Sequence, residues 1–329
     1  FKEENGMAQQ REEEINFFKP LDLSSIKTYS IKERKNLSNI NLFAKPVLPA
    51  DGIHAFFESL PDVLASAHLR KVIDAIVLAY RNKHPVVMAL GAHVIKCGLS
   101  PLIIDLMNRR LITALAMNGA AAIHDYEVSL IGATSEDVAS SLKDGSFGMA
   151  KETAGAFQAA SSQGMKEGRG LGRALGDKII EEKNRYNDLS LLACAAKLNI
   201  PTTVHVALGT DTIHMHPNVS GRNLGESSHI DFKILASVVS KLEGGVWLNV
   251  GSAVIMPEVF LKALCIARNV GHKVENFVTV NMDMIQHYRP QTNVVKRPTQ
   301  LGYAITGHHE IMLPLLRIGI LSKLGIGDE

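Results

Sequence analysis

The sequence predicts an α/β protein built on a doubly wound, mostly parallel sheet with helices on both faces. Three observations support this fold class. Short apolar runs alternate with segments of helical periodicity from about residue 84 to the end of the chain. Glycine or asparagine residues mark many of the transitions between them. The composition, with 46% hydrophobic and 21% charged residues, is that of a globular protein with a sizeable core.

The predicted strands are short apolar runs bounded by turn residues, as buried parallel strands are. They cover residues 84–94, 111–119, 201–210, 244–254 and 276–283. Helical periodicity lies between and after them, over residues 98–110, 121–132, 189–199, 257–271 and 309–325. Gly132 stands past the end of the second helix, where a left-handed cap favours glycine.

Residues 134–184 combine a capping pattern with closely spaced glycines. Thr134 opens "TSEDVASSLKDG", which resembles a capping box. The glycines at 168, 170, 172 and 176 superficially resemble a phosphate-binding loop. No predicted strand directly precedes them and no GK[ST] follows, so we expect a flexible helical connection instead.

The first 50 residues differ from the rest of the chain. They are polar and charged, and "KPVLP" closes them with two prolines. We interpret residues 1–50 as an N-terminal arm on a single domain that spans 51–329, although a disordered tail has the same composition. Because the chain begins at Phe1, we expect residues 1–6 to be added sequence and Met7 to be the native start.

Charge and cysteine content exclude several functional classes. With 35 basic and 33 acidic residues, the net charge of +2 argues against nucleic acid as the main ligand. The three cysteines are far apart and form no CxxC pair, which indicates a reducing, cytoplasmic location. No run of about 18 apolar residues and no leader pattern is present, so we expect neither membrane insertion nor secretion.

The candidate site residues stand where the predicted strands end. In doubly wound sheets, ligands bind at the carboxyl ends of the strands, next to helix N-termini that favour anions. The candidate segments are residues 93–98, 118–119, 209–216, 250–252 and 281–287.

The sequence resembles the deoxyhypusine synthase family. The resemblance begins at "KCGLSPLIIDLMNRRLITALAMNGAAAIHDYEVSLIG" and continues through "PTTVHVALGTD", "LNVGSAV" and "ITGHHEIMLPLL", in consistent order over about residues 85–320. It implies a Rossmann-like domain, a homotetramer, and NAD and a polyamine bound near subunit interfaces. It also implies that the N-terminal extension covers a neighbouring site.

The resemblance further implies which residues surround NAD. They are Cys97, Gly98, Asn118, Gly119, Asp211, Gly251, Ser252, His308 and His309. Glycine lets phosphate approach the backbone, and a carboxylate such as Asp211 accepts hydrogen bonds from ribose hydroxyls. We expect His124 and Asp125 to lie in the first turn of a helix, close to the cofactor. An alternative is that this pair satisfies free backbone N–H groups at the helix start.

Two parts of the family pattern are missing. The family passes an aminobutyl group from spermidine through an active-site lysine that follows an acidic serine-glycine stretch. That stretch is absent, and the family lysine falls on Pro298. Lys296 is the nearest candidate for an imine-forming lysine, although an ordinary surface lysine has the same signature. The family histidine falls near Glu258, which becomes a candidate catalytic residue.

Histidines suggest competing chemistry. "HVALGTDTIHMHP" supplies His214 and His216, which would share one face of an extended segment and could bind a divalent metal, with a further ligand from 308–310. The leading hypothesis is an NAD-binding enzyme acting on a small amine or other polar substrate, with His214 in its site. The alternatives are a metal-assisted hydrolase using His214 and His216, and an inactive nucleotide-binding oligomer.

Overall fold

The computed structural model describes residues 6–7, 10–11 and 20–326, and the chain forms two units, Phe1–Leu42 and Phe43–Glu329. In the first unit, the described residues from 20 onward are mostly exposed and include a short 3₁₀ helix, η1 (Ile40–Leu42). The expected added residues up to Asn5 lie outside the described part. Residues 43–50, which the sequence analysis assigned to the arm, belong to the second unit, where the Lys45 N–H donates to the carbonyl oxygen of Ser59 at 2.9 Å.

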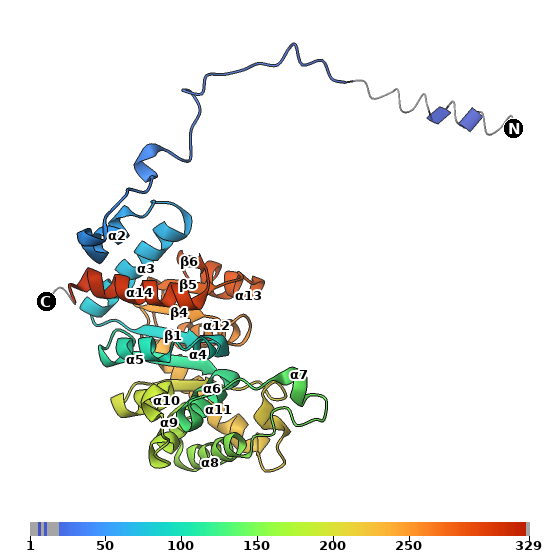
Figure 1. Cartoon of the computed structure of the whole chain (residues 1–329), viewed down its shortest axis with the longest axis vertical. Helices are drawn as coiled ribbons and strands as arrows, with labels where there is room; N and C mark the ends of the chain where they lie inside the picture. Colours follow the sequence, from blue (N-terminus) through green and yellow to red (C-terminus); the bar gives the residue numbers. More distant parts are fainter. Residues whose placement is uncertain (1–5, 8–9, 12–19, 327–329) are drawn as a thin grey trace. The chain divides into compact units, whose positions relative to one another are not determined.

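The second unit is organised around a six-stranded parallel sheet with strand order β3-β2-β1-β4-β5-β6 (Figure 1). The strands are β1 (Val86–Leu90), β2 (Ala114–Asn118), β3 (Thr202–His205), β4 (Val246–Val250), β5 (Val278–Asp283) and β6 (Leu301–Thr306). Every neighbouring pair is parallel. This confirms the predicted fold class, and the strand order is that of dinucleotide-binding Rossmann sheets.

The connecting helices follow the predicted alternation. They are α2 (Gly52–Ser59), α3 (Leu64–Arg81), α4 (Ala92–Lys96), α5 (Ser100–Asn108), α6 (Gly119–Ile131), α7 (Val138–Ser141), α8 (Lys151–Glu167), α9 (Leu171–Glu181), α10 (Leu191–Leu198), α11 (Gly221–Val239), α12 (Ile255–Asn269), α13 (Tyr288–Pro290) and α14 (His309–Leu324). Short helical turns η2 (Pro49–Asp51), η3 (Asn187–Leu189), η4 (Thr212–Met215) and the π-helical η5 (Gln291–Lys296) complete the chain.

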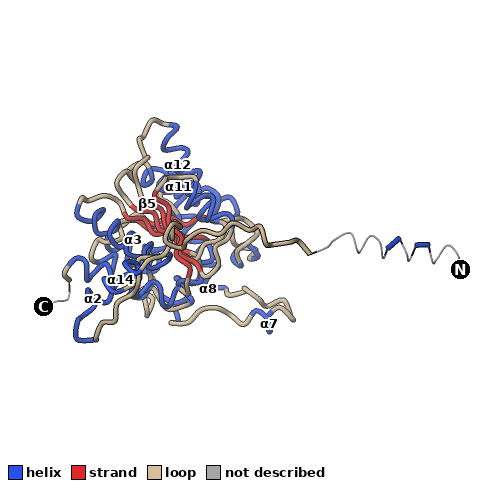
Figure 2. The backbone as a smooth tube through the Cα atoms, turned by 90° about the horizontal axis from the view of Figure 1, so that it is seen from above, coloured by secondary structure: helices blue, strands red, loops and turns tan. Residues whose placement is uncertain are grey.

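Alternate residues of β1, β2 and β4 enter two separate cores, one on each face of the sheet. In β1, Met88 packs with α3, α5, α10 and α14, whereas Val87 packs with α11 and α12. Figure 2 shows α3 and α14 on one side of the strands and α11 and α12 on the other. Because strand side chains alternate between faces and both faces are covered, all five residues of β1 are buried. This arrangement leaves only the ends of the strands available for a ligand.

Helix α6 begins and ends at residues whose chemistry explains its bounds. The side chain of Asn118 accepts a hydrogen bond from the Ala121 N–H at 2.9 Å, which caps the first turn. Gly132 ends the helix in the left-handed conformation, at φ 73°. The helix therefore starts at Gly119, and His124 and Asp125 lie in its second turn. The sequence analysis had placed them in the first turn.

Helix α11 closes the free edge of β3 with buried polar side chains. The Asp231 carboxylate accepts from the backbone N–H groups of Gly172 and Val204, both at 2.8 Å. The Ser228 hydroxyl donates to the Val204 carbonyl oxygen at 2.9 Å and accepts from the Val206 N–H at 3.1 Å. A Cβ on Gly170 would fall 1.7 Å from Asp231, so this glycine permits close packing. The glycine-rich segment is therefore tightly packed rather than a flexible connection.

No helix within the described ranges is both long and apolar enough to cross a membrane.

Candidate functional site

The carboxyl edge of the sheet contains a topological switch point between β1 and β4. The chain runs outward from β1 to β2 and β3 on one side, and from β4 to β5 and β6 on the other. The loops that follow β1 and β4 contact each other, because the Gly91 N–H donates to Val250 O at 2.9 Å and a Cβ on Gly91 would fall 1.8 Å from Gly251 O. In such sheets, ligands bind beside this point.

A cavity of about 280 Å³ opens beyond the carboxyl ends of β2 and β3. Its inner wall comes from α4, α6 and the segment after β3, and its outer wall from the loop before and after α7. The lining has apolar side chains such as Ile123 and Phe147, and charged or titratable ones. The latter are Lys96, His124, Glu127, Glu136, Asp211 and His216. Apolar walls with a few convergent polar groups are typical of small-molecule sites.

Asp211 is the most unusual residue of this cavity. Its Oδ2 is buried and has no hydrogen-bond partner among the described residues. The carboxylate lies against the start of α6, where a Cβ on Gly119 would fall 2.1 Å from Oδ2. Burial raises the pKa of Asp211 to about 6. At neutral pH the ionised form of Asp211 is therefore favoured, although its Oδ2 has no partner among the described residues. The carboxylate fits against the start of α6 only because residue 119 is glycine.

The turn around Asp211 is held by His214. Its Nδ1 accepts the backbone N–H groups of Gly209 at 3.1 Å and Asp211 at 3.2 Å, so the proton of the neutral ring is on Nε2. Burial lowers the pKa of His214, which favours this neutral form. His214 itself does not line the cavity, and its role in this structure is to fix the turn.

His124 and Glu127 lie on the same face of α6 and are joined through Thr134. His124 Nδ1 lies 2.6 Å from Thr134 Oγ1, which donates to Glu127 Oε2 at 2.5 Å. Thr153 donates to the other carboxylate oxygen of Glu127 at 3.3 Å. Burial alone would raise the pKa of Glu127, but the hydrogen bonds with His124 and Thr134 outweigh it and hold that pKa below its ordinary value.

Two hydrogen bonds to the backbone of Gly148 fix the outer wall of the cavity. Its N–H donates to Glu136 Oε2 at 2.8 Å, and its carbonyl oxygen lies 2.9 Å from His216 Nε2. Gly148 has φ 74°, and a Cβ there would lie 2.6 Å from Thr212. Two cavity-lining side chains therefore hold the loop over the cavity.

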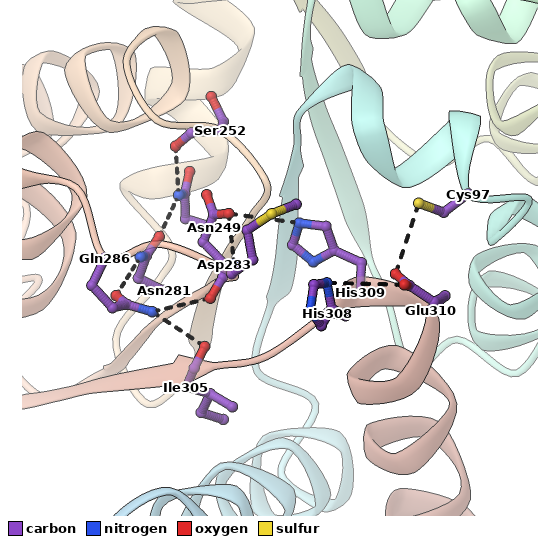
Figure 3. A network of polar contacts seen from close by, with 11 residues as sticks. Cys97, Asn249, Ser252, Asn281, Asp283, Gln286, Ile305, His308, His309 and Glu310 are labelled. Carbon is purple, nitrogen blue, oxygen red and sulfur yellow. Dashed lines mark hydrogen bonds and ion pairs between the residues drawn. The ribbon is translucent and has the colours of Figure 1, made fainter.

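A second polar cluster lies beyond β4, β5 and β6 (Figure 3). His309, the first residue of α14, is 1% exposed, and neither ring nitrogen has a hydrogen-bond partner. Its Nε2 lies 3.9 Å from Asp283 Oδ1 and beneath Gly251, where a Cβ would be 2.8 Å away. Burial lowers the pKa of His309. His308 is exposed beside it, 4.0 Å from Glu310.

Buried amides connect β4 to β5 next to this cluster. Asn249 donates to Asn281 at 2.7 Å and to the Ser252 carbonyl oxygen at 2.9 Å, and Asn281 donates to Gln286 at 2.7 Å. The Ser252 hydroxyl accepts from the Met256 N–H at 3.2 Å and so starts α12. Cys97 lies on the opposite side of the cluster, 3.9 Å from Glu310, at the end of α4 and directly before Gly98 (Figure 3).

Asp125 does not reach the cavity that His124 lines. It is fully buried, and its two carboxylate oxygens accept from the Ser190 hydroxyl at 2.5 Å, the Leu191 N–H at 2.7 Å and the Leu192 N–H at 3.1 Å. These donors belong to the start of α10, a helix distant in sequence. Asp125 therefore satisfies free N–H groups as the alternative interpretation proposed, but those of α10 rather than of its own helix.

Glu258 and Lys296 also lie away from the cavity. Glu258 accepts from Arg289 at 2.6 Å and Asn293 at 2.9 Å, which ties α12 to α13 and η5. Lys296 is exposed at the end of η5. The preceding residue, Val295, packs on Gly302, the second residue of β6. Because β6 is parallel to its neighbour, this residue lies near the amino edge of the sheet. Lys296 therefore lies toward the edge opposite the other candidates.

The structure does not place His214 and His216 on one face, as the predicted metal site required. The segment is the 3₁₀ turn η4 instead of an extended strand, so the expected common face does not exist. His214 is engaged with backbone N–H groups and His216 with Gly148. Within the described ranges, no group of three or more His, Cys, Asp or Glu side chains is placed to hold a metal ion.

The cavity and the loop around it contain candidate residues that the sequence analysis missed. Glu127 could have been found, because it lies three residues after His124 and such pairs share a helix face. Lys96, Thr134 and Glu136 gave no comparable signal, because their position depends on how α4 and the loop around α7 fold over α6.

Neither a protein-family model nor a curated protein matches the sequence. Solved structures resemble it in fold. AgrE in its ternary complex with ornithine and NAD⁺ is 14% identical, with a TM-score of 0.53 over 80% of this chain and 34% of AgrE. A conserved protein from Methanococcus maripaludis S2, proposed to be of the LOR/SDH type, is 15% identical, with a TM-score of 0.51 over 80% of this chain and 72% of that one.

A protein from Entamoeba histolytica that is proposed to be a deoxyhypusine synthase is 11% identical, with a TM-score of 0.45 over 85% of this chain and 95% of that one. At these identities the comparisons establish the Rossmann-like fold, distantly similar to that of NAD-binding proteins. The match spans about a third of AgrE.

Proposed function

We propose that this chain is an NAD-dependent enzyme that dehydrogenates a small amine. The cofactor would lie along the carboxyl edge of the sheet, with one ribose at Asp211 and Gly119, and the amine would occupy the cavity beside His124. The single observation that carries the proposal is the buried, unpartnered Oδ2 of Asp211 against the start of α6. A ribose diol supplies two hydroxyl donors for such a carboxylate, as acidic residues do in dinucleotide-binding folds.

The surrounding residues fit part of a dinucleotide. Gly119 has no Cβ, so the Asp211 carboxylate packs directly against the start of α6, and the N-terminus of this helix favours a phosphate. Gly91 and Gly251 stand at the switch point, where the remaining part would pass. The turn after β1 has no GxGxxG pattern. A cavity of about 280 Å³ is too small for a whole dinucleotide, so it would hold one nucleoside end and a small substrate.

The charges of the cavity favour a cationic substrate. Glu127, Glu136 and Asp211 contribute three carboxylates, against one lysine, Lys96. A protonated amine would be attracted by this excess of negative charge. AgrE, which has a similar fold, has been crystallised with both ornithine and NAD⁺, and this supports an amine as the substrate class. The homotetramer implied by the family resemblance stays a prediction.

The proposal is tested by NAD binding to the full chain and to two variants. D211N keeps the size of the side chain but removes the charge. D188N is the matched control, because Asp188 is 89% exposed, pairs with Lys197 and lies outside the cavity. Hydrogen bonds to charged groups contribute about 1.5–3 kcal/mol, so D211N should bind NAD roughly 10-fold to 150-fold more weakly, measured by titration calorimetry.

Thermal unfolding provides a second readout on the same proteins. NAD at about 100 times its dissociation constant should stabilise the wild type and D188N by roughly 2.7 kcal/mol. No binding by the wild type up to millimolar NAD would overturn the proposal. Equal affinity of the wild type and D211N would overturn the assignment of Asp211.

A further inference from the structure

The hydrogen bonds among Glu127, Thr134 and His124 determine where the proton of the neutral His124 ring is. Thr134 has one hydroxyl hydrogen, and its oxygen lies 2.5 Å from Glu127 Oε2 and 2.6 Å from His124 Nδ1. An ionised carboxylate can only accept, so the hydroxyl hydrogen goes to Glu127. The Thr134 oxygen must then accept from His124, which requires a hydrogen on Nδ1.

Two further contacts keep Glu127 in this role. Thr153 donates to its other oxygen at 3.3 Å, and the net effect of its surroundings keeps the pKa of Glu127 below the ordinary value. Both favour the ionised acceptor over a protonated acid. In the described part of the chain, no group hydrogen-bonds to Nε2 of His124, and the residue lines the cavity. The neutral ring therefore keeps a free lone pair on Nε2.

We propose that Glu127 and Thr134 are positioning residues that hold the proton of His124 on Nδ1, so that Nε2 accepts the N–H proton of an amine in the cavity. The placement of the proton rests on the hydrogen bonds alone. The acceptor role also rests on the proposed function. Carboxylates that orient a histidine in this way fix its tautomer and stabilise the imidazolium that forms, and here a threonine hydroxyl bridges the two groups.

The chemistry balances with NAD as the two-electron oxidant. The protonated amine first releases one proton to solvent. When the resulting neutral amine becomes an imine, the N–H bond and the adjacent C–H bond break, a C=N bond forms, the C–H hydrogen leaves as hydride to NAD and the N–H proton goes to His124 Nε2. The positive charge then formed on the ring is stabilised by Glu127 through Thr134. Lys96, Glu136, Asp211 and His216 also line the cavity and contribute to the field at the ring.

The proton position is measurable without knowing the substrate. In long-range ¹H–¹⁵N NMR spectra of the full chain, recorded where the ring is neutral, His124 Nδ1 should have the shift of a protonated nitrogen and Nε2 that of an unprotonated one. The signals are assigned by their loss in H124Q. T134V should move the proton toward Nε2, because the acceptor for Nδ1–H is lost, whereas T134S should retain the wild-type pattern. If T134V does not fold, E127Q tests the same chain of hydrogen bonds from Glu127 through Thr134 to His124.

A control variant and a second readout complete the test. T292V removes a hydroxyl from η5, outside the cavity, and should leave the His124 signals unchanged. A wild-type ring with its proton on Nε2, or a folded T134V with the wild-type pattern, would overturn the inference whatever the result of NAD binding. Amine-dependent reduction of NAD should fall about 10²-fold to 10⁴-fold in H124Q, and an undiminished rate would overturn the acceptor role while leaving the cofactor proposal intact.

Discussion

In the absence of a ligand, Asp211 should lower the free energy of unfolding, and D211N should restore part of this loss. Burial raises the pKa of this carboxyl from 3.8 to about 6. One pKa unit corresponds to about 1.4 kcal/mol, so ionising Asp211 in the folded state costs up to about 3 kcal/mol more than in the unfolded chain. Asparagine avoids the charge but leaves a buried amide, so we expect D211N to be more stable by about 1–3 kcal/mol at pH 7.

The sign of the pH dependence follows from the direction of the pKa shift. Between 3.8 and about 6 the folded chain binds the Asp211 proton more strongly than the unfolded chain does. Stability from this group is therefore fully present below pH 3.8 and is lost as the pH rises through about 6. D211N should lack this loss, so the difference in unfolding free energy between variant and wild type should grow from pH 4 to pH 7.

Urea denaturation of both proteins at several pH values measures this difference. Comparing the two chains cancels Asp125 and Asp231, which also have raised pKa values and are common to both. Parallel pH curves for the two proteins would refute the argument, because they would show that Asp211 is solvated or already paired. Saturating NAD should reverse the order, since only the wild type would gain the full binding energy.

Three further substitutions test other parts of the structure. D125A should lower the unfolding free energy by about 2–4 kcal/mol in urea denaturation, because it leaves the start of α10 without its buried acceptor. G119A should weaken NAD binding at least about 10-fold by calorimetry, because its Cβ would fall 2.1 Å from Asp211 Oδ2 and displace the carboxylate. K296A should leave NAD affinity unchanged in the same titration, since Lys296 lies toward the amino edge of the sheet.

The sequence predicted the fold well wherever strands are buried on both faces. All residues of β1 and β4 are buried, so each strand appears as a continuous apolar run. The edge strand β6 has only one buried residue, and it lies outside the five apolar runs predicted as strands. Helix α11 was harder to delimit, because Asp231 and Ser228 occupy buried positions that helical periodicity reserves for apolar side chains.

The site was predictable where one backbone turn determines it and not where two segments meet. Asn118 ends β2 and Asp211 follows β3 in the loop at the same edge of the sheet, and such positions can be identified from the sequence. His124 and Asp125 were treated as a pair, but consecutive residues of a helix project about 100° apart, so only one of them can face the cavity. Thr134 appeared to start a helix, whereas its hydroxyl bonds Glu127 and α7 begins after Asp137.

Asp211, which is partly buried, differs from the fully buried Asp125 and Asp231 in a way that supports a ligand site. Asp125 has hydrogen bonds to both oxygens. Burial raises the pKa of Asp231 to about 8, which favours its uncharged form at neutral pH, and one of its oxygens accepts two backbone N–H groups. Asp211 alone among these three combines a charge at neutral pH with an unpartnered oxygen, and it lines a cavity. A buried charge without a partner is costly, so a ligand with hydroxyl donors is the simplest reason for its position.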